Sequence, residues 1–337
     1  MHTPPTKKQP ATQHAKRGGR GATSRSAVSY SAPAKIILCG EHAVVYGKPA
    51  LICALDLRLT VSITPSSNTY ADDQLKYVAT KVIEYLTRKN IPLTSVGGYR
   101  ASIRSQIPSG RNLGSSAAFS VAAAAAFLHF YTGVESGREM INAVAYEVEK
   151  RFHGNPSGAD NSTSCFGGLI YYRKEFEFLK HISALNAKLP QIFVDHLFIV
   201  QTGKPKESTA DMVAAVGRAY NEDPTRIEGA MNLIEKATKK MTLAVTGENA
   251  DMCRDAIVEN EAQLEVLGVV SQRTKMLLAQ LAPYGVGKVT GGGGRAAGSG
   301  NVLFFAYEPL VAAQYFDKNN ISYLRFVQDY QGVKKES

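Results

Sequence analysis

Apolar runs, alternating stretches and helical spacing follow one another along the first half of the chain. Apolar or alternating runs predict strands at 35–38, 50–63 and 99–106. Amphipathic spacing predicts helices at 72–90 and 137–153, and an alanine-rich apolar stretch predicts another at 115–131. This order indicates an α+β protein, because a parallel α/β sheet would alternate strand and helix regularly.

The second half of the chain has its own set of predicted elements. A hairpin is predicted after Gly167-Gly168, with strands at 169–173 and 176–179. The stretch 185–191 carries little periodic signal. Beyond it we predict helices at 208–220, 225–245, 250–267 and 271–281, and strands at 196–201, 286–290, 302–306 and 323–326. The low-signal stretch therefore divides the predicted fold into an N-terminal domain, 29–190, and a C-terminal domain, 191–332.

Composition agrees with two packed domains and a basic extension. The chain has 337 residues, 44% of them hydrophobic and 20% charged, so it can bury substantial cores. Its net charge is +10, and 1–28 holds six basic residues and no acid, which leaves +4 for the rest, a surplus that suits anionic ligands. We predict that 1–28 is disordered. It lacks the amphipathic stripe of an organellar transit peptide and the aromatic residues typical of nucleic-acid arms.

The cysteines and the most apolar stretch indicate the compartment. Cys39, Cys53, Cys165 and Cys253 show no CxxC spacing and no secretory signal, so we expect free thiols in a reducing compartment, the cytoplasm. We expect Cys39 and Cys53 to pack as small hydrophobic residues. The stretch 117–131 is short and interrupted by polar residues, so no membrane span is predicted.

A glycine-rich segment leads into the alanine-rich helix. Gly110 and Gly114 allow positive φ and close approach of a phosphate, and the first turn of the helix offers unpaired N–H groups and partial positive charge. Ser115 and Ser116 add hydroxyls able to reach a phosphate oxygen or a Mg²⁺ ion. The segment lacks the Gly-Lys-Ser/Thr ending of a Walker A loop, and taken alone it fits an ordinary serine cap equally well.

Two acidic residues follow this loop in the sequence. Glu149 follows Ile141 and Ala145 in steps of four, near the edge of the buried helix face, where a carboxylate is unfavourable unless paired or metal-bound. Asp160 lies beyond Pro156, which prevents the helix from continuing, and is therefore delivered by a constrained turn. The commoner role for such an aspartate is a loop position or a helix cap.

These segments and two others resemble one enzyme family. The run 32–48, Ala-Pro-Ala-Lys-Ile-Ile-Leu-Cys-Gly-Glu-His-Ala-Val-Val-Tyr-Gly-Lys, resembles the first motif of the mevalonate kinases. The run 153–161, His-Gly-Asn-Pro-Ser-Gly-Ala-Asp-Asn, resembles their catalytic-aspartate motif. Asn260, Leu264 and 267–271 resemble a helix-end signature of the same family. The resemblance runs from about residue 31 to the C-terminal region and identifies the chain as a member of the GHMP kinase superfamily.

The resemblance implies a fold and a reaction. The fold would be a two-domain α+β kinase, with an N-terminal ATP-binding domain, a C-terminal α/β domain and the site between them. The reaction would move the γ-phosphoryl group of ATP to the C5 hydroxyl of (R)-mevalonate, with Mg²⁺ as cofactor, within isoprenoid and sterol biosynthesis. The ATP-binding segment would comprise Pro108, Ser109, Gly110, Arg111, Asn112, Leu113, Gly114, Ser115, Ser116 and Ala117.

Further roles carry over onto matching positions by resemblance. Asp160 would accept the proton of the attacking hydroxyl, with Lys35 beside it. Ser116 and Glu149 would hold Mg²⁺. The substrate side would be formed by Glu41, His42 and Ser157. Such residues suit phosphoryl transfer, which needs in-line positioning and charge compensation more than covalent chemistry.

The chain departs from the family pattern in two loops. Arg111 and Asn112 replace a small residue and a glycine of the phosphate loop. Because Asn tolerates left-handed geometry, the loop can keep its shape, and we expect Arg111 to point to solvent. The third motif reads Thr-Gly-Gly-Gly-Gly-Arg over 290–295, which leaves the register of its last glycine open at Arg295. Strands predicted on both sides favour a turn near the phosphates over a flexible linker.

Three functions are alternatives to mevalonate kinase: another kinase of the superfamily, a binding protein and a nucleic-acid-binding protein. Homoserine kinases and galactokinases share the phosphate-loop pattern, but the runs 42–48 and 153–161 favour mevalonate kinase. A relative that has lost phosphoryl transfer and acts as a binding protein is opposed by retention of the residues named above. A nucleic-acid-binding role would rest on 1–28 alone. We therefore expect small-molecule substrates, no nucleic acid and no membrane, and the sequence leaves a homodimer open.

Overall fold

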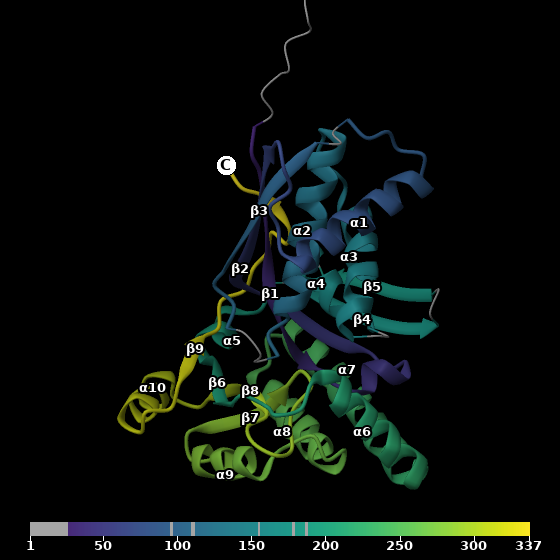
Figure 1. Cartoon of the computed structure of the whole chain (residues 1–337). Coiled ribbons are helices and arrows are strands. Elements are labelled where there is room, and N and C mark those ends of the chain that lie inside the picture. Colours follow the sequence, from purple (N-terminus) through teal and green to yellow (C-terminus); the bar gives the residue numbers. More distant parts are fainter. Residues whose placement is uncertain (1–25, 95–96, 109–111, 154–155, 177–178, 186–187) are drawn as a thin grey trace, which may run out of the picture.

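The computed structural model describes residues 26–94, 97–108, 112–153, 156–176, 179–185 and 188–337. The predicted extension, 1–28, lies almost wholly outside these described residues, as do Ser109, Gly110 and Arg111 of the phosphate loop. The described chain forms two antiparallel sheets with their helices, and one hydrophobic core continues from one sheet to the other (Figure 1).

The larger sheet has the strand order β10-β1-β2-β4-β5, with β3 paired to β2. Its strands are β1 (Val28–Cys39), β2 (Ala50–Ser66), β3 (Gly98–Ser105), β4 (Leu169–Phe176), β5 (Leu179–Leu185) and β10 (Lys334–Lys335). β2 pairs with β1 along most of its length and with β3 and β4 on its other edge. β1 is buried almost throughout, and Lys35 is the one charged residue of this strand.

Four helices cover one face of this sheet (Figure 1). They are α1 (Asp73–Arg88), α2 (Ser115–Thr132), α3 (Arg138–His153) and α4 (Ala159–Phe166). α2 is buried on almost all sides, because its alanines at 122–126 let β1, β2 and the neighbouring helices approach closely. Its N-terminus is thereby fixed against β1.

The smaller sheet has the strand order β7-β8-β6-β9. Its strands are β6 (Leu197–Gly203), β7 (Gly285–Thr290), β8 (Gly300–Ala306) and β9 (Tyr323–Arg325). The helices of this half are α5 (Gln191–His196), α6 (Thr209–Glu222), α7 (Pro224–Thr246), α8 (Ala250–Val266), α9 (Gln272–Leu281) and α10 (Pro309–Lys318). A short 3-10 helix, η1 (Ala43–Tyr46), follows β1.

The α+β fold predicted from the sequence is confirmed, and the differences lie at short elements. The prediction did not include α4, α5, α10 or β10. β5 spans Leu179–Leu185, so the second hairpin strand predicted at 176–179 was placed too early. Asp160, predicted in a turn, lies in the first turn of α4. The polar run 161–164 is a weak helix former, but its side chains are buried, and the Ser162 and Thr163 hydroxyls donate to carbonyls one turn earlier.

The division into domains 29–190 and 191–332 stays a prediction. Side chains from both halves, such as Leu51 and Phe305, belong to one core cluster. β10 lies beyond residue 332 and pairs with β1, so the C-terminal segment returns to the first sheet. Arg58 of β2 anchors this segment, because its guanidinium donates to the carbonyl oxygen of Gly332 at 2.6 Å and pairs with the carboxylate of Asp329.

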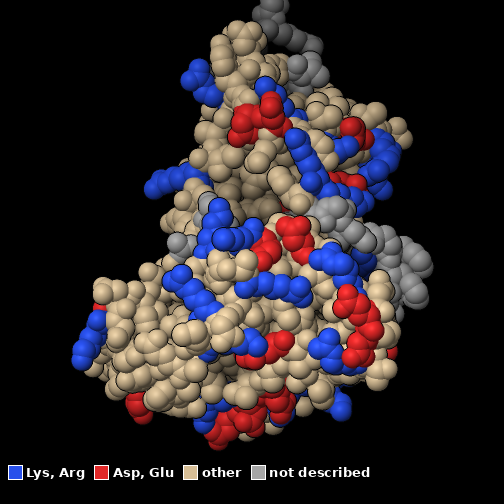
Figure 2. All heavy atoms as spheres, turned by 60° about the horizontal axis from the view of Figure 1, so that its bottom comes forward, with Lys and Arg blue, Asp and Glu red and all other residues tan. Residues whose placement is uncertain are grey.

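Other expectations concern thiols, charge and membranes. All four cysteines are free and buried, and burial raises the pKa of the Cys39 thiol to about 12, in agreement with packing as a small hydrophobic residue. Figure 2 shows basic and acidic side chains interspersed over the described part of the visible face. None of the described helices is long and apolar enough to cross a membrane.

Candidate active site

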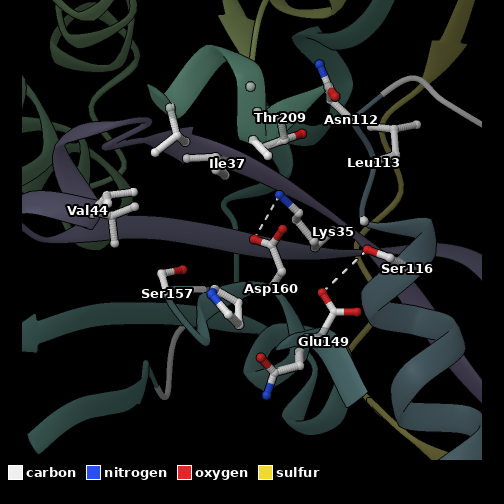
Figure 3. A pocket seen from close by; sticks show the side chains of 18 of the residues that line it. Lys35, Ile37, Val44, Asn112, Leu113, Ser116, Glu149, Ser157, Asp160 and Thr209 are labelled. Carbon is white, nitrogen blue, oxygen red and sulfur yellow. Dashed lines mark hydrogen bonds and ion pairs between the residues drawn. The ribbon is translucent and has the colours of Figure 1, made fainter. Parts of the chain in front are cut away.

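A cavity of about 540 Å³ is lined by residues from both halves of the chain. One side is formed by β1, η1 and the N-terminal ends of α2 and α4, with one side chain of α3. The other side is formed by the start of α6 and the glycine loop after β7. Figure 3 shows their side chains pointing toward one another across the cavity. The sequence separation of these segments is large, so the cavity exists only in the folded chain.

Lys35 and Asp160 form the central ion pair of the cavity. Lys35 Nζ lies 2.9 Å from Asp160 Oδ1, and the side-chain exposures are 4% and 37% (Figure 3). The Lys35 stem lies against Gly114, where a Cβ atom would sit 2.7 Å from Lys35 Cγ. Gly114 also has φ of +73°, so both its conformation and its contact require glycine. Both residues line the cavity, and Asp160 is the more exposed member of the pair.

The phosphate loop joins this pair to α2. The backbone N–H of Lys35 donates to the carbonyl oxygen of Leu113 at 3.0 Å, which ties the loop to β1. Asn112 adopts φ of +63°, so the left-handed conformation expected of the residue that replaces a family glycine is confirmed. The N-cap residue of α2 is Gly114, which has no side chain to accept from the N–H groups of the first helical turn. The side-chain amide nitrogen of Asn112 is buried and has no hydrogen-bond partner among the described residues.

Glu149 lies beneath the start of α2 and is only 2% exposed. Ser120 Oγ donates to Glu149 Oε1 at 2.7 Å, and Ser116 Oγ donates to Oε2 at 3.4 Å. Burial, together with the charge of nearby Asp160, raises the pKa of the Glu149 carboxyl to about 7. The charged form is therefore unfavourable unless a cation compensates it.

These oxygens fit a Mg²⁺ ion. Mg²⁺ prefers hard oxygen ligands, binds through one or two carboxylates, and completes its octahedron with water and substrate phosphates. The Ser116 hydroxyl, the Glu149 carboxylate and the open side of Asp160 supply such oxygens at one end of the cavity. A cation there would also relieve the unfavourable burial of the Glu149 charge.

His42 and Ser157 also line the cavity, and Figure 3 shows Ser157 on the other side of Asp160 from Ser116. His42 has φ of +57° and donates through Nε2 to the carbonyl oxygen of Gly292 at 3.2 Å. Burial lowers the pKa of the His42 imidazole to about 4, so the ring is neutral at physiological pH. The Ser157 hydroxyl accepts from the backbone N–H of Ala159 at 3.2 Å and so lies at the start of α4.

Glu41 lies elsewhere than expected. It is fully buried and outside the set of described residues that line the cavity, although its neighbour His42 belongs to that set. Its carboxylate pairs with the Lys288 ammonium and accepts from Asn260 Nδ2 at 3.0 Å. The positive φ of His42 turns the chain there, so the two side chains point to different surroundings. The structure thus places the Glu41 carboxylate in a buried ion pair, and its expected role on the substrate side stays a prediction.

The structure adds lining residues that sequence reasoning missed. Val44 and Val45 come from η1, and Thr209, Ala210 and Val213 come from the first turns of α6. Thr209 lies against the glycine loop, since a Cβ atom at Gly292 would sit 3.0 Å from its hydroxyl oxygen. The sequence did predict a helix from 208, and α6 begins after a capping box at Ser208. No local signal could have indicated that α6 closes the cavity.

Comparison with known proteins supports the family resemblance. Residues 77–168 match the family model described as the GHMP kinases N terminal domain. The mevalonate kinase of Methanothermobacter thermautotrophicus is 30% identical over 275 residues, covering 79% of this chain and 87% of that protein. The mevalonate kinase of Thermococcus sibiricus is 33% identical over 300 residues, covering 78% of this chain and 86% of that protein.

Solved structures share the fold across several acceptors. The mevalonate kinase of L. major in complex with R-mevalonate superimposes with a TM-score of 0.73 at 21% identity, covering 92% of this chain and 98% of that chain. The phosphomevalonate kinase of Streptococcus pneumoniae gives a TM-score of 0.72 at 15% identity, covering 93% and 100%. Because kinases named for different acceptors have this fold, the fold alone does not select an acceptor.

Proposed function

The chain belongs to the mevalonate kinases, a group within the GHMP kinases, and we propose that it transfers the γ-phosphoryl group of ATP to the C5 hydroxyl of (R)-mevalonate. The observation that supports this most strongly is the Lys35–Asp160 pair, set at 2.9 Å in a cavity that the N-terminus of α2 also lines. The N-terminus of α2 suits an anionic phosphate chain. The Asp160 carboxylate suits the role of proton acceptor for an alcohol bound beside it.

The phosphates of ATP bind at the start of α2. The N–H groups of its first turn and the helix dipole attract negative charge, and Gly114 leaves room for a phosphate to approach the backbone. Ser115 and Ser116 line the cavity at this point. The predicted contribution of Ser109, Gly110 and Arg111 concerns residues outside the described ones and stays a prediction.

Ser116 and Glu149 would hold a Mg²⁺ ion at the start of α2. Such an ion would supply positive charge to offset the negative charge that develops on the phosphates during transfer. Glu149 supplies a carboxylate from α3, and Ser120 keeps that carboxylate oriented through its 2.7 Å hydrogen bond. Burial of Glu149 disfavours its charge without a cation, so metal binding and ionisation of this group are coupled.

Asp160 accepts the proton that leaves the C5 hydroxyl as its oxygen attacks the γ-phosphorus. The bond between that phosphorus and the bridging oxygen of ADP breaks, and the proton stays on the carboxylate until the products leave. The Lys35 ammonium lies beside Asp160 and offsets negative charge between the carboxylate and the phosphoryl group. His42 and Ser157 position the acceptor with neutral hydrogen-bonding groups, and Val44, on η1, gives this end of the cavity an apolar wall.

An acceptor panel tests the proposal. ADP release is measured by a coupled assay with mevalonate, phosphomevalonate, homoserine and galactose at equal concentrations. We expect mevalonate to give the dominant kcat/KM. A dominant response to any other acceptor would overturn the assignment, and no ADP release with any of them would favour a relative that only binds these ligands.

The wider context follows from this reaction. The product, 5-phosphomevalonate, belongs to isoprenoid biosynthesis by the mevalonate pathway, which is the context that the family implies. Four points stay predictions: a link to sterols, a cytoplasmic location, organellar targeting by 1–28 and a homodimer.

A further inference from the structure

A fully buried ion pair joins the two halves of the chain, and His42, next to one of its members, lines the cavity. The side chains of Glu41 and Lys288 are both 0% exposed. Glu41 follows β1, and Lys288 belongs to β7 of the other sheet. The Lys288 ammonium also donates to the carbonyl oxygens of Val289 at 2.9 Å and Ile37 at 3.3 Å, so its three protons all have acceptors.

Helix α8 completes this buried cluster. Asn260 Nδ2 donates to Glu41 Oε2 at 3.0 Å, so both carboxylate oxygens of Glu41 are bound. The next residue, Glu261, accepts from the backbone N–H of Val289 at 2.7 Å. The end of β1, β7 and α8 are distant in sequence and meet at this ammonium and carboxylate. Their contacts fix the position of β7 relative to the end of β1.

The cluster is connected to the cavity through two residues that line it. Ile37 lines the cavity, and its carbonyl oxygen accepts from the Lys288 ammonium and also from the Thr290 hydroxyl at 3.1 Å. His42 lines the cavity, is adjacent to Glu41, and donates to Gly292 of the loop that follows β7. A shift of β7 against β1 would therefore change the separation of His42 and the glycine loop.

Overall stability does not explain why charges occupy this position. Replacing a buried ion pair with apolar side chains of similar volume is often neutral or stabilising, whereas removing one partner leaves an uncompensated charge and is strongly destabilising. A buried pair does impose one geometry, because each charge must meet its hydrogen-bond partners. The benefit here is geometric, since the pair sets where β7 and its glycine loop lie relative to His42.

We infer that Glu41 and Lys288 are positioning residues that hold the glycine loop against His42 and thereby set the width of the acceptor end of the cavity. They act without touching the acceptor. The inference rests on the proposed function for the identity of that acceptor, whereas the contacts that carry it are independent of any ligand. It is an alternative to the role on the substrate side that the resemblance implied for Glu41.

The test compares single and double substitutions. Glu41→Gln and Lys288→Met each leave a buried charge unpaired, so both single variants should lose folding stability. The double variant, Glu41→Gln with Lys288→Met, is uncharged and should recover most of the wild-type Tm. It should still raise the KM for mevalonate by roughly 10- to 100-fold, as expected for misplaced binding groups, with the KM for ATP changed less than about twofold. A wild-type KM for mevalonate in a folded double variant would overturn the inference.

A matched control uses an ion pair that is not among the described residues lining the cavity. Lys240 of α7 pairs with Glu259 of α8, and both are partly exposed. The double variant Lys240→Met with Glu259→Gln should leave both KM values unchanged. If it raised the KM for mevalonate as much as the buried double variant does, the effect would be general loosening of the C-terminal half, and the inference would fail.

A ligand-free measurement separates this inference from the proposed function. Amide hydrogen exchange at Gly291 and Gly292 should be faster in the buried double variant than in the wild type and in the control. Unchanged exchange together with a raised KM would indicate direct contact between Glu41 and the acceptor, and would overturn positioning. If the wild type does not phosphorylate mevalonate, the proposed function fails, while the exchange result still decides the positioning role.

Discussion

Replacing Glu149 with Gln is predicted to stabilise the ligand-free protein in alkaline solution and to have little effect in acid. Glu149 is buried beneath α2, and burial raises the pKa of its carboxyl from the ordinary 4.5 to about 7. The folded state therefore resists ionisation more than the unfolded state does. The protonated Glu149 carboxyl therefore contributes to the free energy of unfolding fully below pH 4.5, and this contribution is lost as the pH rises through 7.

The size of the effect follows from the shift. The pKa of the Glu149 carboxyl shifts from 4.5 to about 7, and each pKa unit corresponds to about 1.4 kcal/mol. Ionisation of this group therefore removes about 3 kcal/mol of folding stability from the wild type. Gln cannot ionise, and its amide oxygen can keep the hydrogen bond from Ser120. The variant should therefore be more stable by about 3 kcal/mol at pH 8.5 and by less than about 1 kcal/mol at pH 5.

Urea unfolding of both proteins from pH 4.5 to 8.5, without nucleotide or metal, measures this difference. Glu147→Gln is the control, because Glu147 lies on the same helix but is 41% exposed and pairs with Lys150. The control should show no comparable rise with pH. A stability difference between Glu149→Gln and wild type that is the same at all pH values would refute the reasoning, because the effect would then be one of packing and not of ionisation.

Three further substitutions test the proposed roles. Asp160→Asn should lower kcat by roughly 10²- to 10⁴-fold with ATP affinity retained, measured by steady-state kinetics and calorimetry, and activity within a few-fold of wild type would remove Asp160 from proton transfer. Ser116→Ala should raise the Mg²⁺ concentration for half-maximal activity at near-wild-type stability, and an unchanged Mg²⁺ titration would leave Ser116 an ordinary helix-start serine. Arg58→Met should reduce the free energy of unfolding by about 3–5 kcal/mol, because Asp329, with a 6% exposed side chain, loses its partner. Urea unfolding checks this, and a loss below about 1 kcal/mol would contradict the buried-pair account.

The sequence predicted the parts of the site that are marked by local chemistry. Gly114 and the serines after it indicated a phosphate-binding helix start, and α2 begins there. Glu149 and Asp160 were singled out by their positions around a helix end, and the structure brings both to the cavity that contains Lys35. Such local patterns can be detected because backbone requirements act within a few residues.

The parts that were missed depend on contacts between distant segments. Helix α4 forms despite the poor helix propensity of 161–164, because burial and hydrogen bonds within the helix outweigh propensity. The partner of Glu41, Lys288, lies 247 positions away, so no local pattern could distinguish a buried ion pair from a substrate ligand. The return of β10 to β1 likewise depends on Arg58 contacting residues near the C-terminus.

Phosphorus NMR of the isolated product tests the central claim most directly. Purified protein is incubated with ATP, Mg²⁺ and (R)-mevalonate, and the new phosphorus signal is recorded with proton coupling. A phosphate on C5 is split into a triplet by the two protons of that carbon, which is the result predicted here. A singlet would place the phosphate on the tertiary C3 oxygen or on the carboxylate, and the absence of a new phosphate ester would show that mevalonate is not the acceptor. Either result would contradict transfer to the C5 hydroxyl beside Asp160.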